Sequence, residues 1–270
     1  MKYNIKIDDV GPDFWEKMDA LGIKRFTKRD GRIYQYVSYD TALKIIESNC
    51  LHYSTPNSFN DPFDLTSGLL DTSIAKEDLV KLVTDGFDAS EDERQKIIDY
   101  NLANPDLIPT LFAKTLEDTK SDIGITCFSK SYLKTLMWSH YANKHSGVCF
   151  GFSFNQVAGD GIMQLTVRYT DKVEARNYFK ETIFSIYNWI FTKSKVWEYE
   201  EEVRRVYIKD KGLIPFDKFE LVEVYYGVRI SDDQIKKIQA LLKVNGYDNI
   251  SKQSTMKINP QTFDLIEHKL

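Results

Sequence analysis

Alternation of apolar and polar residues predicts several β-strands along this chain. The segment 32–39, RIYQYVSY, alternates aromatic and β-branched residues with polar ones. In the segment 147–154, GVCFGFSF, every second residue is valine or phenylalanine, so these side chains should share one side of a strand. Five further runs are expected to be strands, at positions 50–55, 123–129, 163–170, 197–208 and 219–228.

Apolar positions at helical spacing predict the remaining elements. A helix is expected over 40–49 with Asp40 as its N-cap, and three helical patterns follow one another between about 73 and 119. Further helices are expected at 132–145, 174–195 and 231–247. Because strands and helices do not alternate regularly as βαβ units, the sequence predicts an α+β fold. Mixed or antiparallel sheets would surround a cleft, with a helical insertion at about 73–119.

Composition is that of a soluble globular protein. Of the 270 residues, 42% are hydrophobic and 28% charged, with a formal net charge of −4, so disorder is disfavoured and no overall basic field attracts nucleic acid. We expect a single domain over 32–270 preceded by an appendage over 1–31, which ends in the basic segment KRFTKRDGR. No signal peptide or membrane-spanning run is recognised, so a cytoplasmic location without a membrane partner is expected. Cys50, Cys127 and Cys149 lack metal-ligand spacing and are interpreted as core thiols.

The segment KVWEYEEEVRRVY contains the first candidate for chemistry. On a strand, Glu200, Glu202 and Arg204 would share one face, and Glu201 and Arg205 the other. An arginine beside a carboxylate keeps it ionised, and an ionised carboxylate can stabilise an oxocarbenium-like transition state at a sugar. Taken alone, the same pattern more often marks a solvated strand with surface ion pairs.

The loop segment NSFNDPFD contains further acidic residues. Asn60, Asp61 and Asp64 surround Pro62, and the two carboxylates could bind a metal ion or a ribose. Asx turns that fix a rigid loop are the simpler explanation. If the loop is functional, we expect it to lie close to Glu202.

Aromatic and hydroxyl residues supply possible ring and ribose contacts. Tyr34 and Tyr36 share a predicted strand face, and Ser54 and Thr55 end the next strand, although ordinary sheet packing explains both. In the helix over 132–145, helical spacing places His140 on the buried stripe, with Trp138 and Tyr141 at its edge. His140 is therefore expected to support the site from behind. No histidine pair has zinc-ligand spacing, so no metal site is expected.

Several of these segments, in this order, resemble a family of bacterial and phage proteins described only as a domain of unknown function. The motifs that carry the resemblance are Asn60-Asp61-Pro62-Phe63-Asp64, Trp138-Ser139-His140-Tyr141-Ala142, Gly147-Val148-Cys149 and Trp197-x-Tyr199-Glu200-x-Glu202-x-Arg204. The resemblance extends over about residues 32 to 230.

The order of elements is also similar to that of the ADP-ribosyltransferase fold, through the aromatic first strand, the Ser-Thr strand end and the late Glu-x-Glu. This similarity implies that NAD is a substrate. Gln35 or Tyr36 would take the first-strand role, Ser54 and Thr55 would support the nicotinamide, and Glu202 would be the catalytic carboxylate with Glu200 as its helper. The other cofactor-binding residues expected are Tyr34, Asn60, Asp61, Asp64, Trp138, His140, Tyr141 and Arg204. The first strand lacks the histidine or arginine usual in that fold, and the helix around Tyr141 has no counterpart in it.

The implied activity is cleavage of the nicotinamide–ribose bond of NAD and transfer of ADP-ribose to a protein, RNA or DNA acceptor. The setting of such enzymes suggests a toxin or anti-phage defence effector with a cognate antitoxin or defence partner. Two other functions stay open. One is a non-catalytic module that binds a nucleotide or a protein. The other is a metal-dependent hydrolase that uses the residues Asp61, Asp64, His140, Glu200 and Glu202.

Overall fold

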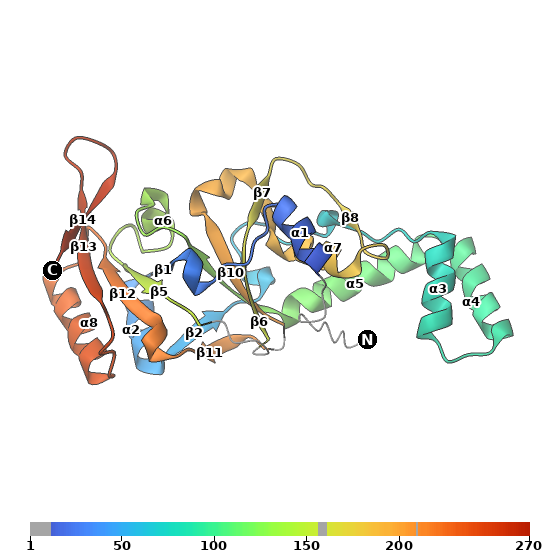
Figure 1. Cartoon of the computed structure of the whole chain (residues 1–270), viewed down its shortest axis with the longest axis horizontal. Helices are drawn as coiled ribbons and strands as arrows, with labels where there is room; N and C mark the ends of the chain where they lie inside the picture. The colour runs from blue at the N-terminus through green and yellow to red at the C-terminus, as the bar shows by residue number, and fades with distance from the viewer. Residues whose placement is uncertain (1–11, 156–160, 209) are drawn as a thin grey trace.

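The centre of the protein is one eight-stranded sheet, seen in a computed structural model that describes residues 12–155, 161–208 and 210–270 (Figure 1). In spatial order its strands are β14 (Leu265–Lys269), β13 (Lys252–Ile258), β12 (Leu221–Tyr226), β5 (Val148–Phe152), β1 (Ile33–Val37), β4 (Gly124–Ser129), β10 (Glu202–Tyr207) and β6 (Ile162–Thr166). Neighbouring strands are antiparallel except β12 and β13, which are parallel. The predicted α+β class with a mixed, mostly antiparallel sheet is therefore confirmed.

Smaller elements surround this sheet. Three two-stranded sheets are formed by β11 (Gly212–Pro215) with β2 (Cys50–Tyr53), β3 (Leu70–Asp71) with β8 (Arg176–Asn177), and β7 (Arg168–Thr170) with β9 (Thr192–Ser194). The α-helices are α1 (Pro12–Ala20), α2 (Tyr39–Ser48), α3 (Lys76–Gly86), α4 (Glu91–Ala103), α5 (Leu107–Asp122), α6 (Thr135–His140), α7 (Thr182–Phe191) and α8 (Asp232–Val244). No helix within the described ranges is long and apolar enough to cross a membrane.

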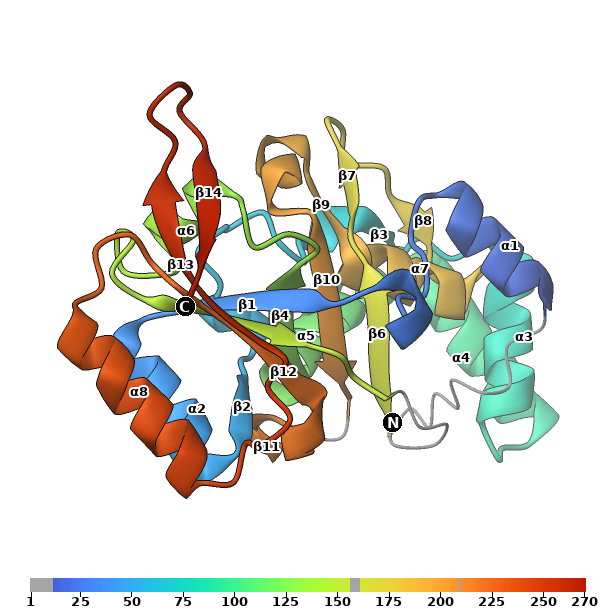
Figure 2. The same ribbon diagram turned by 60° about the vertical axis from the view of Figure 1, so that its left-hand side comes forward.

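The two faces of the large sheet have different roles. On the face that we call the core face, Phe150 and Phe152 of β5 are fully buried against α2 and α8, as their alternation predicts. Cys149 of the same strand points to the opposite face, called the site face here, beneath Trp138 of α6. Figure 2 shows α2 and α8 on one side of the sheet and α6 on the other. The site face also carries Glu202.

Three helices occupy the region where a helical insertion is expected, at about 73–119. Helices α3, α4 and α5 follow one another from Lys76 to Asp122 and extend away from the sheet in Figure 1. Leu79, Val83 and Ile98 form a small separate core between them. A cavity of about 830 Å³ lies between this insertion and the segment from Tyr178 to Thr182.

The described part of the N-terminal segment, expected to be an appendage, packs against the sheet. Met18 and Ile23 are fully buried in the core around α7, and the Phe26 N–H donates to the carbonyl of Gln164 in β6 at 3.1 Å. The backbone of Arg25 forms an isolated antiparallel β-bridge with Leu165 of the same strand. Residues 1–11 lie outside the described residues.

Several predicted elements have different boundaries in the structure, among them the strand expected over 163–170, which is divided into β6 and β7, and the helix expected over 132–145, which is limited to α6. Helix α2 is capped by Ser38, not Asp40, because the Ser38 side chain accepts the Thr41 N–H. The helix expected over 174–195 is limited to α7, since its first part forms β8 beside β3 and its last part forms β9 beside β7. The strand expected over 197–208 begins only at Glu202.

Replacing Gly147 with alanine is expected to lower the free energy of unfolding by about 1–3 kcal/mol. A Cβ there would lie 2.1 Å from the carbonyl oxygen of Val37 and 2.9 Å from that of Ala142, so backbone must shift. Urea unfolding measures the change. Gly86→Ala is the matched control, because a Cβ at that position would meet no atom within 4 Å and alanine favours the helix. Equal effects of the two variants would contradict the prediction.

Candidate functional site

Glu200 and Glu202 approach each other through a backbone kink. Glu200 ends the 3₁₀ helix Lys195–Glu200, and Glu201 has φ 47° and ψ 50°, in the left-handed region. Strand β10 starts at Glu202, so the prediction that Glu200 lies on the same strand is wrong. The kink also turns the Glu201 side chain outward, where its carboxylate accepts a hydrogen bond from Lys134 at 2.6 Å.

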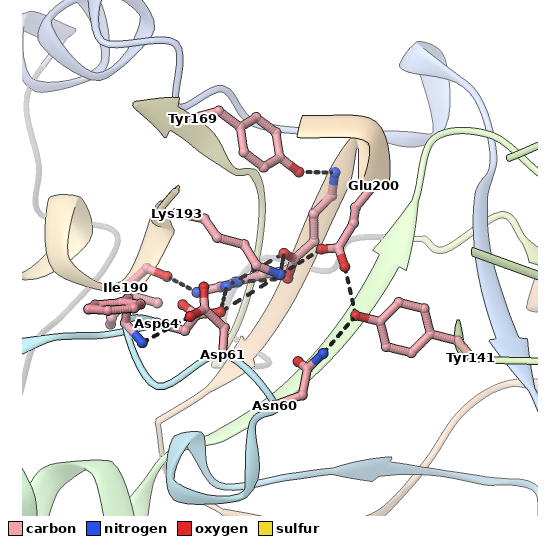
Figure 3. A network of polar contacts seen from close by, with 11 residues as sticks. Asn60, Asp61, Asp64, Tyr141, Tyr169, Ile190, Lys193 and Glu200 are labelled. Atoms are coloured by element: carbon pink, nitrogen blue, oxygen red, sulfur yellow. Dashed lines mark hydrogen bonds and ion pairs between the residues drawn. The ribbon is translucent and has the colours of Figure 1, made fainter. Parts of the chain in front are cut away.

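Two cations hold three carboxylates in one buried network (Figure 3). Lys193 of β9 lies 2.5 Å from Glu200, 3.0 Å from Glu202 and 3.8 Å from Asp64. Arg204 donates from Nε to Glu202 at 2.8 Å and from a terminal nitrogen to Asp64 at 2.6 Å. Its other terminal nitrogen donates to the Ile190 carbonyl at 2.5 Å. Glu200 and Glu202 are each only 3% exposed, and Arg204 is fully buried.

Tyr141 connects this network to the surface. Its hydroxyl donates to Glu200 at 2.7 Å and accepts a hydrogen bond from the side-chain amide of the exposed Asn60 at 3.3 Å. On the other side of the network, the backbone N–H of Glu202 donates to the hydroxyl oxygen of Tyr169 at 2.7 Å. Figure 3 shows Tyr141 and Tyr169 on opposite sides of the carboxylates.

The three carboxylates differ in how readily they take up a proton. Burial alone would raise the pKa of Glu202, but Arg204 and Lys193 outweigh it and lower that pKa to about 2. For Glu200, burial outweighs the opposing effect of Lys193 and raises the pKa. Burial also raises the pKa of Asp64, although Arg204 opposes it. Glu202 is thus firmly ionised, and any proton that enters the network is held more readily by Glu200 or Asp64.

The charges of the network do not balance. Three carboxylates share two cations, so the fully ionised cluster carries one net negative charge. In a poorly solvated setting, such a charge favours either a proton or a positive charge on a neighbouring molecule.

Strained backbone is concentrated next to the network. Among the described residues, the non-glycine residues with positive φ are Asn49, Leu65, Asn143, Lys144, His145 and Glu201. Asn49 caps the end of α2, a common place for this conformation. Each of the others lies within four positions of Asp64, Tyr141 or Glu202. Residues in this region cost about 1–2 kcal/mol each and cluster at functional sites, which favours a functional role for the network.

Cys127 is not the core thiol that the sequence predicts. It lies opposite Arg204 on the neighbouring strand β4, and its residue is exposed. A thiol reagent can therefore reach Cys127 beside the network. Cys149 is buried as predicted, and Cys50 is half-buried.

The first-strand residues do not join the network. Gln35 points to the core face, where its amide donates to Thr126 at 2.9 Å, so it cannot contact a ligand at Glu202. Tyr36 is buried edge-on against Trp138. Tyr34 and Glu202 both pair with Ser129 of β4, on opposite sides of that strand, so Tyr34 lies two strands away from Glu202. The ring of Tyr34 packs against Tyr132.

The acidic loop lies at the site, as expected. Asp64 bonds to Arg204, and Asn60 bonds to Tyr141. Ser54 and Thr55 stand at the start of this loop, where Ser54 pairs with Ile125 and Thr55 accepts a hydrogen bond from the Ser58 hydroxyl at 2.8 Å. Their expected nicotinamide role stays a prediction.

The expectation that His140 is buried is wrong. Helix α6 ends at His140, and the stripe on which the expectation was based faces outward, since Leu133 and Leu136 on that stripe are 42% and 48% exposed. His140 is exposed, whereas Trp138 is fully buried and donates from its indole N–H to the Tyr132 carbonyl at 2.8 Å.

His140→Ala is therefore expected to change the melting temperature by less than about 2 °C, as for other surface substitutions. Thermal unfolding followed by circular dichroism tests this. Trp138→Ala should in contrast destabilise strongly, since it leaves a large cavity. A large loss for His140→Ala would show that its side chain does support the site.

Sequence reasoning missed two network residues, Lys193 and Tyr169. Both lie on the short strands β7 and β9, which pair in parallel. Lys193 follows directly after the apolar run of α7, and a lysine at the end of such a run signals a buried charge that needs partners. No comparable signal marks Tyr169.

The described residues contain no group of three or more histidine, cysteine, aspartate or glutamate side chains able to hold a metal ion. In the network, Lys193 and Arg204 occupy the positions between the carboxylates that a cation would take. A metal ion between these carboxylates would therefore have to displace Lys193 or Arg204.

A segment of the chain matches a protein-family model. No curated protein sequence matches the chain. The match extends over residues 137–205. This segment contains the network residues Tyr141, Tyr169, Lys193, Glu200, Glu202 and Arg204, and leaves out the loop of Asn60 and Asp64. The family is described as "Protein of unknown function (DUF2971)".

Proposed function

We propose that the network is the site of an ADP-ribosyltransferase-like reaction. NAD would be cleaved at its nicotinamide–ribose bond, and ADP-ribose would pass to a macromolecular acceptor. The observation that carries the proposal is the unbalanced charge, because three carboxylates share only two cations. As nicotinamide leaves, positive charge develops on the ribose ring, and a fixed net negative charge stabilises it.

The two glutamates would have different roles in this reaction. Glu202 provides a fixed anion, since Arg204 and Lys193 keep its pKa at about 2. Glu200 is bonded through Tyr141 to the surface, so it is the carboxylate better placed to orient a ribose hydroxyl or to accept a proton from the acceptor. Neither carboxylate is exposed in this conformation, so binding of NAD requires local opening of the protein around them.

A second function is supported by the fact that both carboxylate oxygens of Glu202 already have hydrogen-bond partners. One of its oxygens bonds to Arg204 and the other to Lys193, an arrangement typical of a buried structural brace. In that case the protein is a binding module that recognises a nucleotide or a partner protein without turnover.

Incubation of the purified protein with NAD labelled in its adenylate part, together with cell lysate, separates the two functions. The transferase reaction predicts release of free nicotinamide and appearance of label in the protein, RNA or DNA fraction. A chelator should leave the reaction unchanged. Binding of NAD with no nicotinamide released would support the binding module, and absence of both would reject NAD as the ligand.

A further inference from the structure

Two carboxylate oxygens in the acidic loop are buried without a hydrogen-bond partner. Asp61 accepts the Phe63 N–H with one oxygen at 2.9 Å, while its second oxygen is unpaired. Asp64 binds Arg204 with one oxygen, while its other oxygen is unpaired. Each aspartate thus uses one oxygen to maintain the local structure and leaves the other without a donor. The residues are only 5% and 8% exposed, so water does not readily compensate for the missing bonds.

These unpaired oxygens would be satisfied by a ligand that donates hydrogen bonds. A metal ion is disfavoured, because Arg204 and Lys193 already lie 2.6 Å and 3.8 Å from Asp64. Sugar hydroxyls are suitable donors, since a hydroxyl bonded to an ionised carboxylate forms a short, strong hydrogen bond. Both aspartates lie beside the network in Figure 3, on a loop that reaches Tyr141 through Asn60.

We propose that Asp61 and Asp64 bind the vicinal hydroxyls of a ribose. This inference rests on the proposed function, because the sugar would be the ribose whose bond to nicotinamide is broken. It assigns the loop the task of holding that ring against Glu200 and Glu202.

The loop must move before a sugar can reach these oxygens, which are enclosed by protein here. Two features allow such a movement. The contact between Asn60 and Tyr141 is long, at 3.3 Å, and Leu65 at the end of the loop is held in the left-handed region at φ 49°. Opening would expose the unpaired oxygens to solvent, which lowers the cost of the movement.

Asp61→Asn is the most informative substitution. The asparagine carbonyl can still accept the Phe63 N–H, so the turn is kept, while the unpaired oxygen is replaced by an amide that cannot accept from a hydroxyl. We expect affinity for ADP-ribose, measured by calorimetry, to fall at least about tenfold. The melting temperature should stay within a few degrees of the parent, because the substitution removes a buried charge but places two N–H donors in the same enclosed position. Asp88→Asn, on an exposed part of the helical insertion, is the control and should change neither quantity.

Binding of ADP-ribose and of an analogue, measured together with NAD turnover, distinguishes this inference from the proposed function. The parent protein should bind ADP-ribose at least about tenfold more tightly than an analogue that lacks the 2- and 3-hydroxyls of the terminal ribose. Binding of this kind without NAD turnover would reject the transferase and keep the ribose site. Turnover with unchanged ADP-ribose affinity in Asp61→Asn would overturn the ribose site and keep the transferase. Failure of the parent to bind ADP-ribose would overturn the ribose site, and absence of nicotinamide release in the same protein would overturn the transferase as well.

Discussion

Arg204→Met is expected to lower the free energy of unfolding by about 3–5 kcal/mol. The guanidinium is fully buried and bonds to Glu202, Asp64 and the Ile190 carbonyl, so methionine leaves two buried carboxylates with only Lys193 as counter-ion. Urea unfolding at pH 7 measures the loss. A penalty of this size comes mainly from the charges left unpaired, and does not measure the net contribution of the ion pairs to stability.

The neighbouring Arg205 provides the matched control. It is buried on the core face and stacks on Phe154 with its guanidinium carbon 3.6 Å from the ring centroid. Among the described residues it donates hydrogen bonds to the neutral side chains of Tyr53 and Gln164. Arg205→Met leaves no buried carboxylate unpaired among the described contacts of Arg205. Its free energy of unfolding should therefore fall by less, about 1–2 kcal/mol. Equal losses at the two positions would show that the charge network does not determine the effect.

Lowering the pH should reduce the difference in free energy of unfolding between the parent protein and Arg204→Met. In the parent, the pKa of Glu202 is lowered from 4.5 to about 2 in the folded state. Its contribution to stability is therefore complete above about pH 4.5 and is lost as the pH falls toward 2. In Arg204→Met this contribution is largely absent from the start, so the unfolding free energies of the two proteins should converge over that range.

The sequence predicted those parts of the fold that depend on local periodicity. The phenylalanines of β5 alternate against a continuous apolar core, so the pattern identifies both the strand and its buried side. The helical insertion could be predicted for the same reason, because its apolar residues recur at helical spacing and pack between its own helices. Glu200 was misplaced because it lies beside the left-handed Glu201, where a simple repeat no longer gives the direction of a side chain. His140 was misplaced because the buried side of α6 carries Met137 and Trp138, whereas Leu136 on the expected stripe is exposed.

The site could be predicted only in part, because it is assembled from distant segments. Glu202 and Arg204 alternate on one strand, so their proximity follows from the sequence. The approach of Asp64 and Lys193 depends on tertiary contacts, since Asp64 stands 140 positions from Arg204 and Lys193 lies on a two-stranded sheet with no pattern of its own. The acidic residues of the loop mark it as a candidate in the sequence, and the ion pair between Asp64 and Arg204 gives it a physical place in the site.

Glu202→Gln is expected to reduce nicotinamide release from NAD by roughly 10²–10³-fold, the usual cost of losing one preorganised electrostatic contact to a transition state. Glutamine keeps the shape of the side chain but removes the charge, so the cluster becomes neutral when its other members are ionised. The positive charge that develops on the ribose is then no longer offset. Glu200→Gln has the same effect on net charge, and it also replaces the acceptor of the Tyr141 hydroxyl with a weaker one.

Glu201→Gln is the control for both variants. Its side chain points outward to Lys134 and lies outside the network, so turnover should stay within about twofold of the parent, in keeping with the small energetic contribution of exposed ion pairs. Because Glu202→Gln also removes a partner of Lys193 and Arg204, its activity has to be compared below its own unfolding temperature, with circular dichroism showing a folded protein. The transferase reaction predicts a folded Glu202→Gln protein that retains NAD binding and has lost turnover. If Glu202→Gln and Glu201→Gln release nicotinamide at the parent rate, the buried charges act as a brace and the chemistry lies elsewhere.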